Sequence, residues 1–170
     1  MKKLLYGLML LTFLFANANL LKVANAQHNH DYCKQYLNSV NSQLNKFIEI
    51  DERVTAVVQD KTMTLPQKAD MLNRLSNYIR TPRRNMLQLE LPRGITQTTV
   101  FKLTSSIEHL TNAIDFRSMA IKYLAESYID PSDKSKQEKY SQAMDNAMKE
   151  FDIGEKRFRY IERVILTGQH

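Results

Sequence analysis

The chain has few of the residues that cross-link or interrupt a fold. Its 170 residues include one cysteine, four glycines, four prolines and no tryptophan. The single cysteine, Cys33, excludes an internal disulfide. We expect it to be a small apolar residue at the start of a helix, with an intermolecular disulfide as the alternative. Little glycine or proline, and no alternation of apolar and polar residues, argue against a β fold.

Motifs of the common enzyme and metal-binding classes are also absent. The sequence has no Glu-x-x-His, His-x-x-x-His or Cys-x-x-Cys, no glycine-rich phosphate loop and no nucleophile elbow. Three of the four histidines lie near the chain ends, and the fourth, His109, is expected at the surface. Residues 27–30, Gln-His-Asn-His, have weakly metal-like character but are expected to be an ordinary polar terminus. We therefore expect a protein that is not an enzyme and binds no cofactor and no metal.

The N-terminus has the pattern of a secretory signal peptide. Two lysines at positions 2 and 3 precede an apolar run over residues 4–15, and Ala-Asn-Ala at residues 24–26 supplies a cleavage site. The alternative, an uncleaved anchor, is disfavoured because about 20 apolar residues are needed to span a bilayer. We expect residues 1–26 to be removed, residues 27–31 to form a flexible tail, and residues 32–168 to form one helical domain. The short run after paired lysines is typical of bacterial export, so the product is expected to be periplasmic or secreted.

Apolar residues at helical spacing predict four helices. The first covers residues 32–60, and a capping box, Thr64 with Gln67, opens the second. Pro82 is expected to break or kink the second helix, which continues for one or two turns before residue 92. The third covers residues 100–130, with an apolar residue at every seventh position. The fourth is expected to run from a capping box, Ser135 with Glu138, to residue 168.

These helices and their short links predict an all-α fold, an antiparallel up-down-up-down four-helix bundle whose second helix is broken at Pro82. The alternative is a three-helix bundle in which the broken helix forms an irregular arm. Gly154 lies on the apolar stripe of the last helix, which indicates that another helix approaches closely there. Asp51 and Arg117 interrupt the stripes of the first and third helices at the same height and are predicted to form a buried structural ion pair. The alternative is that both helices rotate and leave the two charges at the solvent edge.

Positive charge is concentrated in one segment. The whole chain carries a net charge of +6, and loss of the three lysines at positions 2, 3 and 22 leaves +3. Residues 66–102 alone carry +5. Within that segment a cationic cluster lies beside apolar residues, and these are the predicted partner-binding residues: Arg80, Arg83, Arg84, Arg93, Leu87, Leu89 and Leu91. The alternative is a solvated bend whose leucines pack back on the bundle.

An exposed cationic and apolar surface suits an acidic protein or an anionic lipid surface. Nucleic acid is not expected, because the compartment is wrong and no aromatic residues alternate with the arginines. We therefore expect a binding or assembly component of the bacterial cell envelope or of a secretion apparatus. A periplasmic chaperone for unfolded clients and a secreted effector are the alternatives. The oligomeric state is left open.

Overall fold

The computed structural model describes the backbone of residues 2–167 and the side chains of residues 31–167. This part of the chain is all-helical and contains no strand. Its elements are α1 (Lys2–Gln59), α2 (Leu65–Tyr78), α3 (Arg80–Leu87), α4 (Gln97–Ile129) and α5 (Lys134–Thr167). The backbone of α1 runs through the predicted signal peptide and tail, whose side chains up to residue 30 lie outside the described residues.

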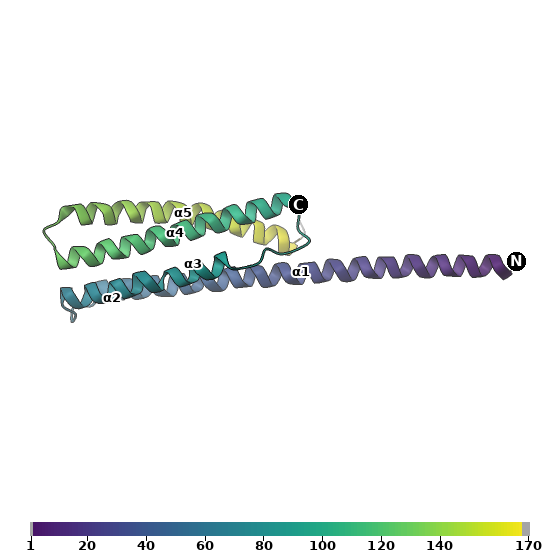
Figure 1. Cartoon of the computed structure of the whole chain (residues 1–170), viewed down its shortest axis with the longest axis horizontal. Helices are drawn as coiled ribbons and strands as arrows, with labels where there is room; N and C mark the ends of the chain where they lie inside the picture. Colours follow the sequence, from purple (N-terminus) through teal and green to yellow (C-terminus); the bar gives the residue numbers. More distant parts are fainter. Residues whose placement is uncertain (1, 168–170) are drawn as a thin grey trace.

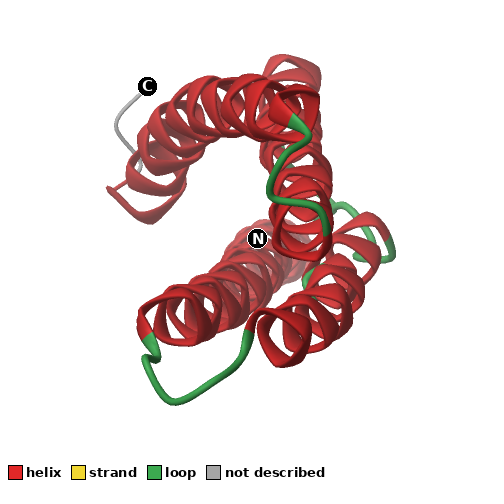
Figure 2. Cartoon of the chain, turned by 90° about the vertical axis from the view of Figure 1, so that its left-hand side faces the viewer, coloured by secondary structure: helices red, strands yellow, loops and turns green. Residues whose placement is uncertain are grey.

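The helices lie lengthwise beside one another (Figure 1). α2 and α3 follow the C-terminal half of α1 back along its length, and α4 and α5 form a second pair above them. α4 packs against α5, α2 and α3, whereas α1 packs against α2, α3 and α5. Figure 2, which looks along the long axis, shows the two short links that join α1 to α2 and α4 to α5 at the near end. The helices therefore form one packed unit in which α4 is the central element.

One hydrophobic core is shared by all five helices. In α4 the predicted seven-residue row is confirmed at its centre, because Ile107, Ile114 and Ile121 are buried. Val100 and Tyr128, at the two ends of this row, are partly buried. The core also contains Ile79, which lies between α2 and α3, and these buried residues from the other helices: Leu37, Val40, Leu44, Leu72, Leu75, Met86, Phe158 and Ile161.

Gly154 of α5 permits a close approach to α4, as its place in the sequence predicts. A Cβ atom at this position would lie 2.9 Å from both the backbone nitrogen and Cγ of Leu110, and 3.1 Å from Cβ of His109. Real Cβ atoms do not come so near to backbone atoms. The α4–α5 contact therefore requires glycine here.

The two predicted capping boxes have different outcomes. At α2 the prediction is confirmed: Thr64 Oγ1 accepts from the Gln67 backbone N–H, and Gln67 Oε1 accepts from the Thr64 backbone N–H at 2.8 Å. At α5 the prediction is wrong, because the helix already begins at Lys134. Asp133 caps it instead, since its Oδ1 accepts from the Ser135 backbone N–H at 3.0 Å and from the Ser135 hydroxyl at 2.6 Å. An aspartate two residues earlier thus competes successfully for the Ser135 donors.

The interruption of the second helical segment falls at Ile79, between α2 and α3. Pro82 lies in the first turn of α3 and is buried. In a first turn the missing N–H of proline removes no helical hydrogen bond, so Pro82 is accommodated there. The turns expected as far as residue 92 end at Leu87, which is the last residue of α3.

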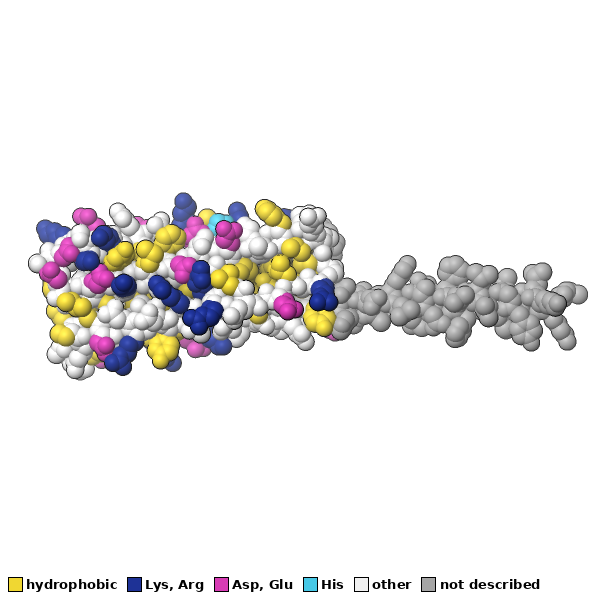
Figure 3. Space-filling model, in the orientation of Figure 1, with side chains coloured by type: hydrophobic (Ala, Val, Ile, Leu, Met, Phe, Trp, Pro, Cys, Tyr) yellow, Lys and Arg dark blue, Asp and Glu magenta, His cyan; other side chains and the backbone are white. Residues whose placement is uncertain are grey.

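One face of the unit is mixed in charge. On the face drawn in Figure 3, basic and acidic side chains are interspersed, and hydrophobic side chains reach the surface between them. Among residues 31–167, no helix combines the length and the apolar character needed to cross a membrane.

Candidate functional site

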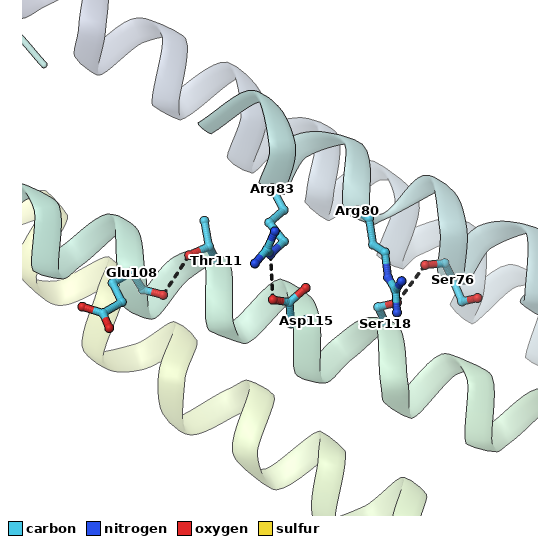
Figure 4. Close-up of polar contacts among 7 residues, drawn as sticks. All are labelled: Ser76, Arg80, Arg83, Glu108, Thr111, Asp115 and Ser118. Carbon is cyan, nitrogen blue, oxygen red and sulfur yellow. Dashed lines mark hydrogen bonds and ion pairs between the residues drawn. The ribbon is translucent and has the colours of Figure 1, made fainter. Parts of the chain in front are cut away.

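The arginine-rich bend is built on α3, which lies against α4. Pro82 and Met86, one turn apart, are buried and fix the inner face of this short helix. Arg80 and Arg83 lie three residues apart and extend toward α4 along the edge of the contact (Figure 4). The burial of one face of α3 therefore determines where its arginines point.

Arg80 is held by a hydrogen-bond relay to α4 and α2. Its Nε donates to the hydroxyl of Ser118 at 3.0 Å, and that hydroxyl donates to the backbone carbonyl of Ser76 at 2.8 Å (Figure 4). Ser118 is buried, with 2% of its surface exposed. The relay satisfies a buried hydroxyl and orders the base of the Arg80 guanidinium at the same time.

Arg83 forms an ion pair with Asp115 of α4. The Arg83 Nε lies 2.6 Å from Oδ2 of Asp115, and the two side chains are 36% and 40% exposed. At this exposure the pair contributes little to the free energy of unfolding. It does fix the direction of Arg83. Figure 4 shows the two side chains meeting across the gap between α3 and α4, with the carboxylate of Glu108 turned away from them.

Arg84 differs from the other two arginines because its side chain is exposed and untethered. Within residues 31–167 this side chain makes no hydrogen bond or ion pair. Leu87, one turn further on, is 54% exposed. The side chains of α3 and α4 enclose a shallow hollow of about 420 Å³, lined by Arg80, Arg83, Arg84, Leu87, Gln88 and Asp115.

The remaining predicted residues do not join this hollow. Arg93 and Leu91 line a different one, of about 430 Å³, between the α3–α4 link and the segment of α1 around Tyr36. Leu89 also lines that second hollow and packs partly buried against the core. The structure therefore divides the predicted site into two places, of which only the first contains a cluster of arginines.

Sequence reasoning missed the α4 side of the bend. Thr111, Asp115 and Ser118 follow one another at steps of four and three, which is the spacing of one helix face. Thr111 turns its hydroxyl to the backbone carbonyl of Glu108, at 2.9 Å, while the other two residues bind the arginines. This polar stripe beside the apolar row of α4 is the feature of the sequence that could have predicted the contacts with the arginines.

Asp51 and Arg117 are brought together. Arg117 is buried at 8% exposure, and its Nε donates to Oδ1 of Asp51 while its Nη1 contacts Sδ of Met144. The side chain of Asp51 is 37% exposed. The pair thus joins α1 to the α4–α5 pair, with one partner inside the core and the other reached by water.

His109 and Cys33 are both less exposed to solvent than surface residues are. Contrary to expectation, His109 is half-buried, and its ring nitrogens contact Glu150 and Arg157 of α5. Cys33 is 3% exposed, and burial raises the pKa of its thiol. An intermolecular disulfide at Cys33 would therefore require a local opening of the fold.

No cluster of three or more histidine, cysteine or acidic side chains in residues 31–167 could hold a metal ion. The metal-like histidines at positions 28 and 30 lie outside the residues whose side chains are described.

Comparisons of the chain with protein families, with curated proteins and with solved structures found no match.

Proposed function

We propose that this chain is an exported, non-enzymatic binding protein of the bacterial cell envelope or of a secretion apparatus. In this proposal its helices form an antiparallel up-down-up-down bundle, with α2 and α3 together as the broken second helix. An acidic surface of a partner protein docks on the bend formed by Arg80, Arg83, Arg84 and Leu87.

The observation that supports this proposal is the arrangement of the three arginines. Arg80 and Arg83 are tethered to Ser118 and Asp115, so little side-chain entropy remains to be lost when they contact a partner. Arg84 stays exposed beside the apolar side chain of Leu87. Arginine beside an exposed apolar residue is a common composition for the centre of a protein interface.

A protein partner fits this bend better than a membrane surface does. Only one acidic residue, Asp115, lines the hollow, and it is already paired with Arg83. The hollow is small and concave, so it suits a few carboxylates presented in a fixed geometry. A flat lipid surface would instead favour a long apolar helix face with many lysines.

The test is crosslinking in living producer cells from a photoreactive residue at position 88, which lines the hollow and leaves the three arginines in place. The matched control carries the same group at Lys149, an exposed position on α5 whose side chain makes no hydrogen bond or ion pair in residues 31–167. One dominant protein adduct from position 88, missing at position 149, supports the proposal and identifies the partner. A mixture of many proteins would overturn it in favour of a chaperone, and adducts with lipid alone would overturn it in favour of peripheral membrane binding.

A charge reversal then tests the role of the arginine. Arg84→Glu is the informative variant, because reversal of Arg80 or Arg83 would also remove their contacts with Ser118 and Asp115 of α4. Arg84→Glu should abolish the adduct formed from a photoreactive residue at Leu87, whereas Arg53→Glu, at an exposed position on α1, should leave it unchanged. Equal adduct yields from the two variants would contradict docking at the bend.

A further inference from the structure

A further hollow lies between the first half of α4 and the last third of α5, and it shares no residue with the bend. Its volume is about 450 Å³. Its walls are formed by Phe101, Lys102, Ser105, Lys156, Arg157 and Tyr160. A smaller hollow of about 210 Å³ shares Lys102 and Tyr160 and extends to the start of α4 at Thr96. Together they form a continuous groove at one end of the α4–α5 pair.

The lining of the groove is positively charged. Three cationic side chains line it, and neither hollow has an acidic side chain in its lining. Lys156 pairs with Asp152 at 2.8 Å, so the attraction for an anion rests on Lys102 and Arg157. Lys102 Nζ lies 5.4 Å from the ring centroid of Tyr160. An anionic group entering the groove would meet attraction and no repulsion from the lining.

Two aromatic rings are exposed in the same groove. Phe101 is 74% exposed and Tyr160 is 55% exposed. Isolated apolar residues on a surface are ordinary, but two large rings beside one concave site give an apolar wall. The groove therefore combines a cationic edge with a surface that can cover an apolar group.

Arg157 is oriented by a chain of hydrogen bonds. Its Nη1 donates to Ser105 Oγ at 2.7 Å and contacts His109 Nε2 at 3.1 Å. Arginine can only donate, so His109 Nε2 accepts, and the proton of the neutral ring is on Nδ1. Nδ1 then donates to Glu150 Oε2, which lies 2.7 Å away. The carboxylate of Glu150 thus fixes the ring of His109, and the ring fixes the guanidinium.

This arrangement leaves one side of the Arg157 guanidinium available. Both hydrogens of Nη1 are engaged, whereas Nε and Nη2 have no partner within residues 31–167. Two neighbouring N–H groups held in a plane match the two oxygens of a carboxylate. The same network argues against catalysis, because Arg157 occupies the nitrogen that His109 would need as a base for Ser105.

We propose that the groove binds a small amphipathic monoanion, with its carboxylate on Arg157 and Lys102 and its apolar part between Phe101 and Tyr160. The volume lies in the range of small-molecule sites. A single acyl chain and an aromatic acid share this chemistry. Glu150 and His109 act as positioning residues, since they hold Arg157 and do not line the groove.

The test uses the chain as its producing cells make it, titrated by isothermal calorimetry with dodecanoate and, separately, with 4-phenylbenzoate. We expect saturable binding of at least one of the two acids and none of dodecanol, the uncharged counterpart. Arg157→Gln should weaken binding at least about tenfold, because a charge-assisted contact is lost. Arg163→Gln is the matched control, an exposed arginine on the same helix that does not line the groove.

The role of the positioning chain is tested by substitution of the histidine. His109→Leu should weaken binding several-fold, and His109→Gln, which can still accept from Arg157, should restore most of it. A merely structural effect would appear in both variants as a lower unfolding midpoint without this difference in affinity. Dodecanoate alone would indicate a lipid-derived ligand and 4-phenylbenzoate alone an aromatic acid. Binding of neither acid, equal binding of dodecanol, or equal effects of Arg157→Gln and Arg163→Gln would overturn the proposal.

Discussion

The α4–α5 pair and helix α1 are held in the fold by different kinds of apolar contact. Where α4 meets α5, small residues allow the two backbones to approach, with Gly154 against Leu110 as the tightest point. The alanines at positions 113, 120, 125, 143 and 147 are buried as well. α1 contributes mostly larger buried side chains, among them Leu37, Leu44 and Phe47. Small residues bring two helices together closely, whereas larger ones keep α1 further from its neighbours.

Polar cross-links supplement the packing of α1. Asn41 donates to Glu162 of α5 at 2.7 Å and accepts from Arg159 at 2.8 Å. Asn85 of α3 donates to Gln43 at 3.0 Å, and Asp51 pairs with Arg117. Directional groups specify the axial position of a helix better than apolar contacts do. Polar contacts also cross the α4–α5 pair, where His109 meets Glu150 and Arg157 meets Ser105, so the difference between the two regions lies in how closely the backbones approach.

Substitution of the glycine should have the largest effect. Gly154→Val would place a branched side chain where a single Cβ already meets a backbone atom at 2.9 Å, so α4 and α5 must separate. We expect a loss of about 3 kcal/mol in the free energy of unfolding, measured by urea denaturation. Gln142→Val is the control, because it introduces the same residue at an exposed position of the same helix. It should cost less than about 1 kcal/mol. Similar losses for the two variants would show that the close approach contributes nothing.

Removal of one charge should test the attachment of α1 with a smaller effect. Asp51→Ala leaves the buried guanidinium of Arg117 without its carboxylate, and we expect a loss of about 2 kcal/mol. The loss stays below that for a fully buried pair, because water already reaches Asp51. Adding Arg117→Met removes the unpaired charge and should recover part of the stability. Glu52→Ala, at the neighbouring exposed position, is the control, and an Asp51→Ala variant as stable as this control would refute the structural role of the pair.

The same comparison explains how far the sequence predicts the fold. Spacing within one helix determines its buried face, so Ile107, Ile114 and Ile121 were identified correctly, and a glycine on that face indicated a close neighbour. Local hydrogen bonding predicted the start of α2. It failed at α5, where Asp133 and Ser135 offer competing caps of similar strength.

Contacts between helices were less predictable, because they depend on rotation and axial shift that no single helix encodes. The pairing of Asp51 with Arg117 could be predicted for one reason: each residue interrupts an apolar stripe, and the two lie at the same distance along their helices. The contacts of Arg80, Arg83 and His109 could not, because their partners on α4 and α5 lie on mixed polar faces where several registers are equally compatible with the sequence. The hollows on the surface depend on the same registers. The arginines that lie close together in the sequence therefore line two separate hollows, with Arg93 apart from the other three.

The smallest effect is expected at the links that join each pair of helices. Asp133 caps the α4–α5 link, where hydrogen bonds from the Ser135 hydroxyl and backbone hold the pKa of its carboxyl below the ordinary value of 3.8. Asp60 is its counterpart at the α1–α2 link, where bonds from Thr62 lower the pKa in the same way. A lowered folded-state pKa stabilises the fold at pH values above 3.8, and this contribution is lost as the pH falls through the folded-state pKa.

Because Asp133 also caps the first turn of α5, Asp133→Ala should lower the unfolding midpoint at pH 7 more than Asp60→Ala does. Both differences from the unsubstituted protein should vanish in acid. Asp145→Ala should show no such dependence, because the exposed side chain of Asp145 makes no hydrogen bond or ion pair in residues 31–167. An equal effect of Asp60→Ala and Asp133→Ala at pH 7 would mean that the helix cap adds nothing to the α4–α5 link.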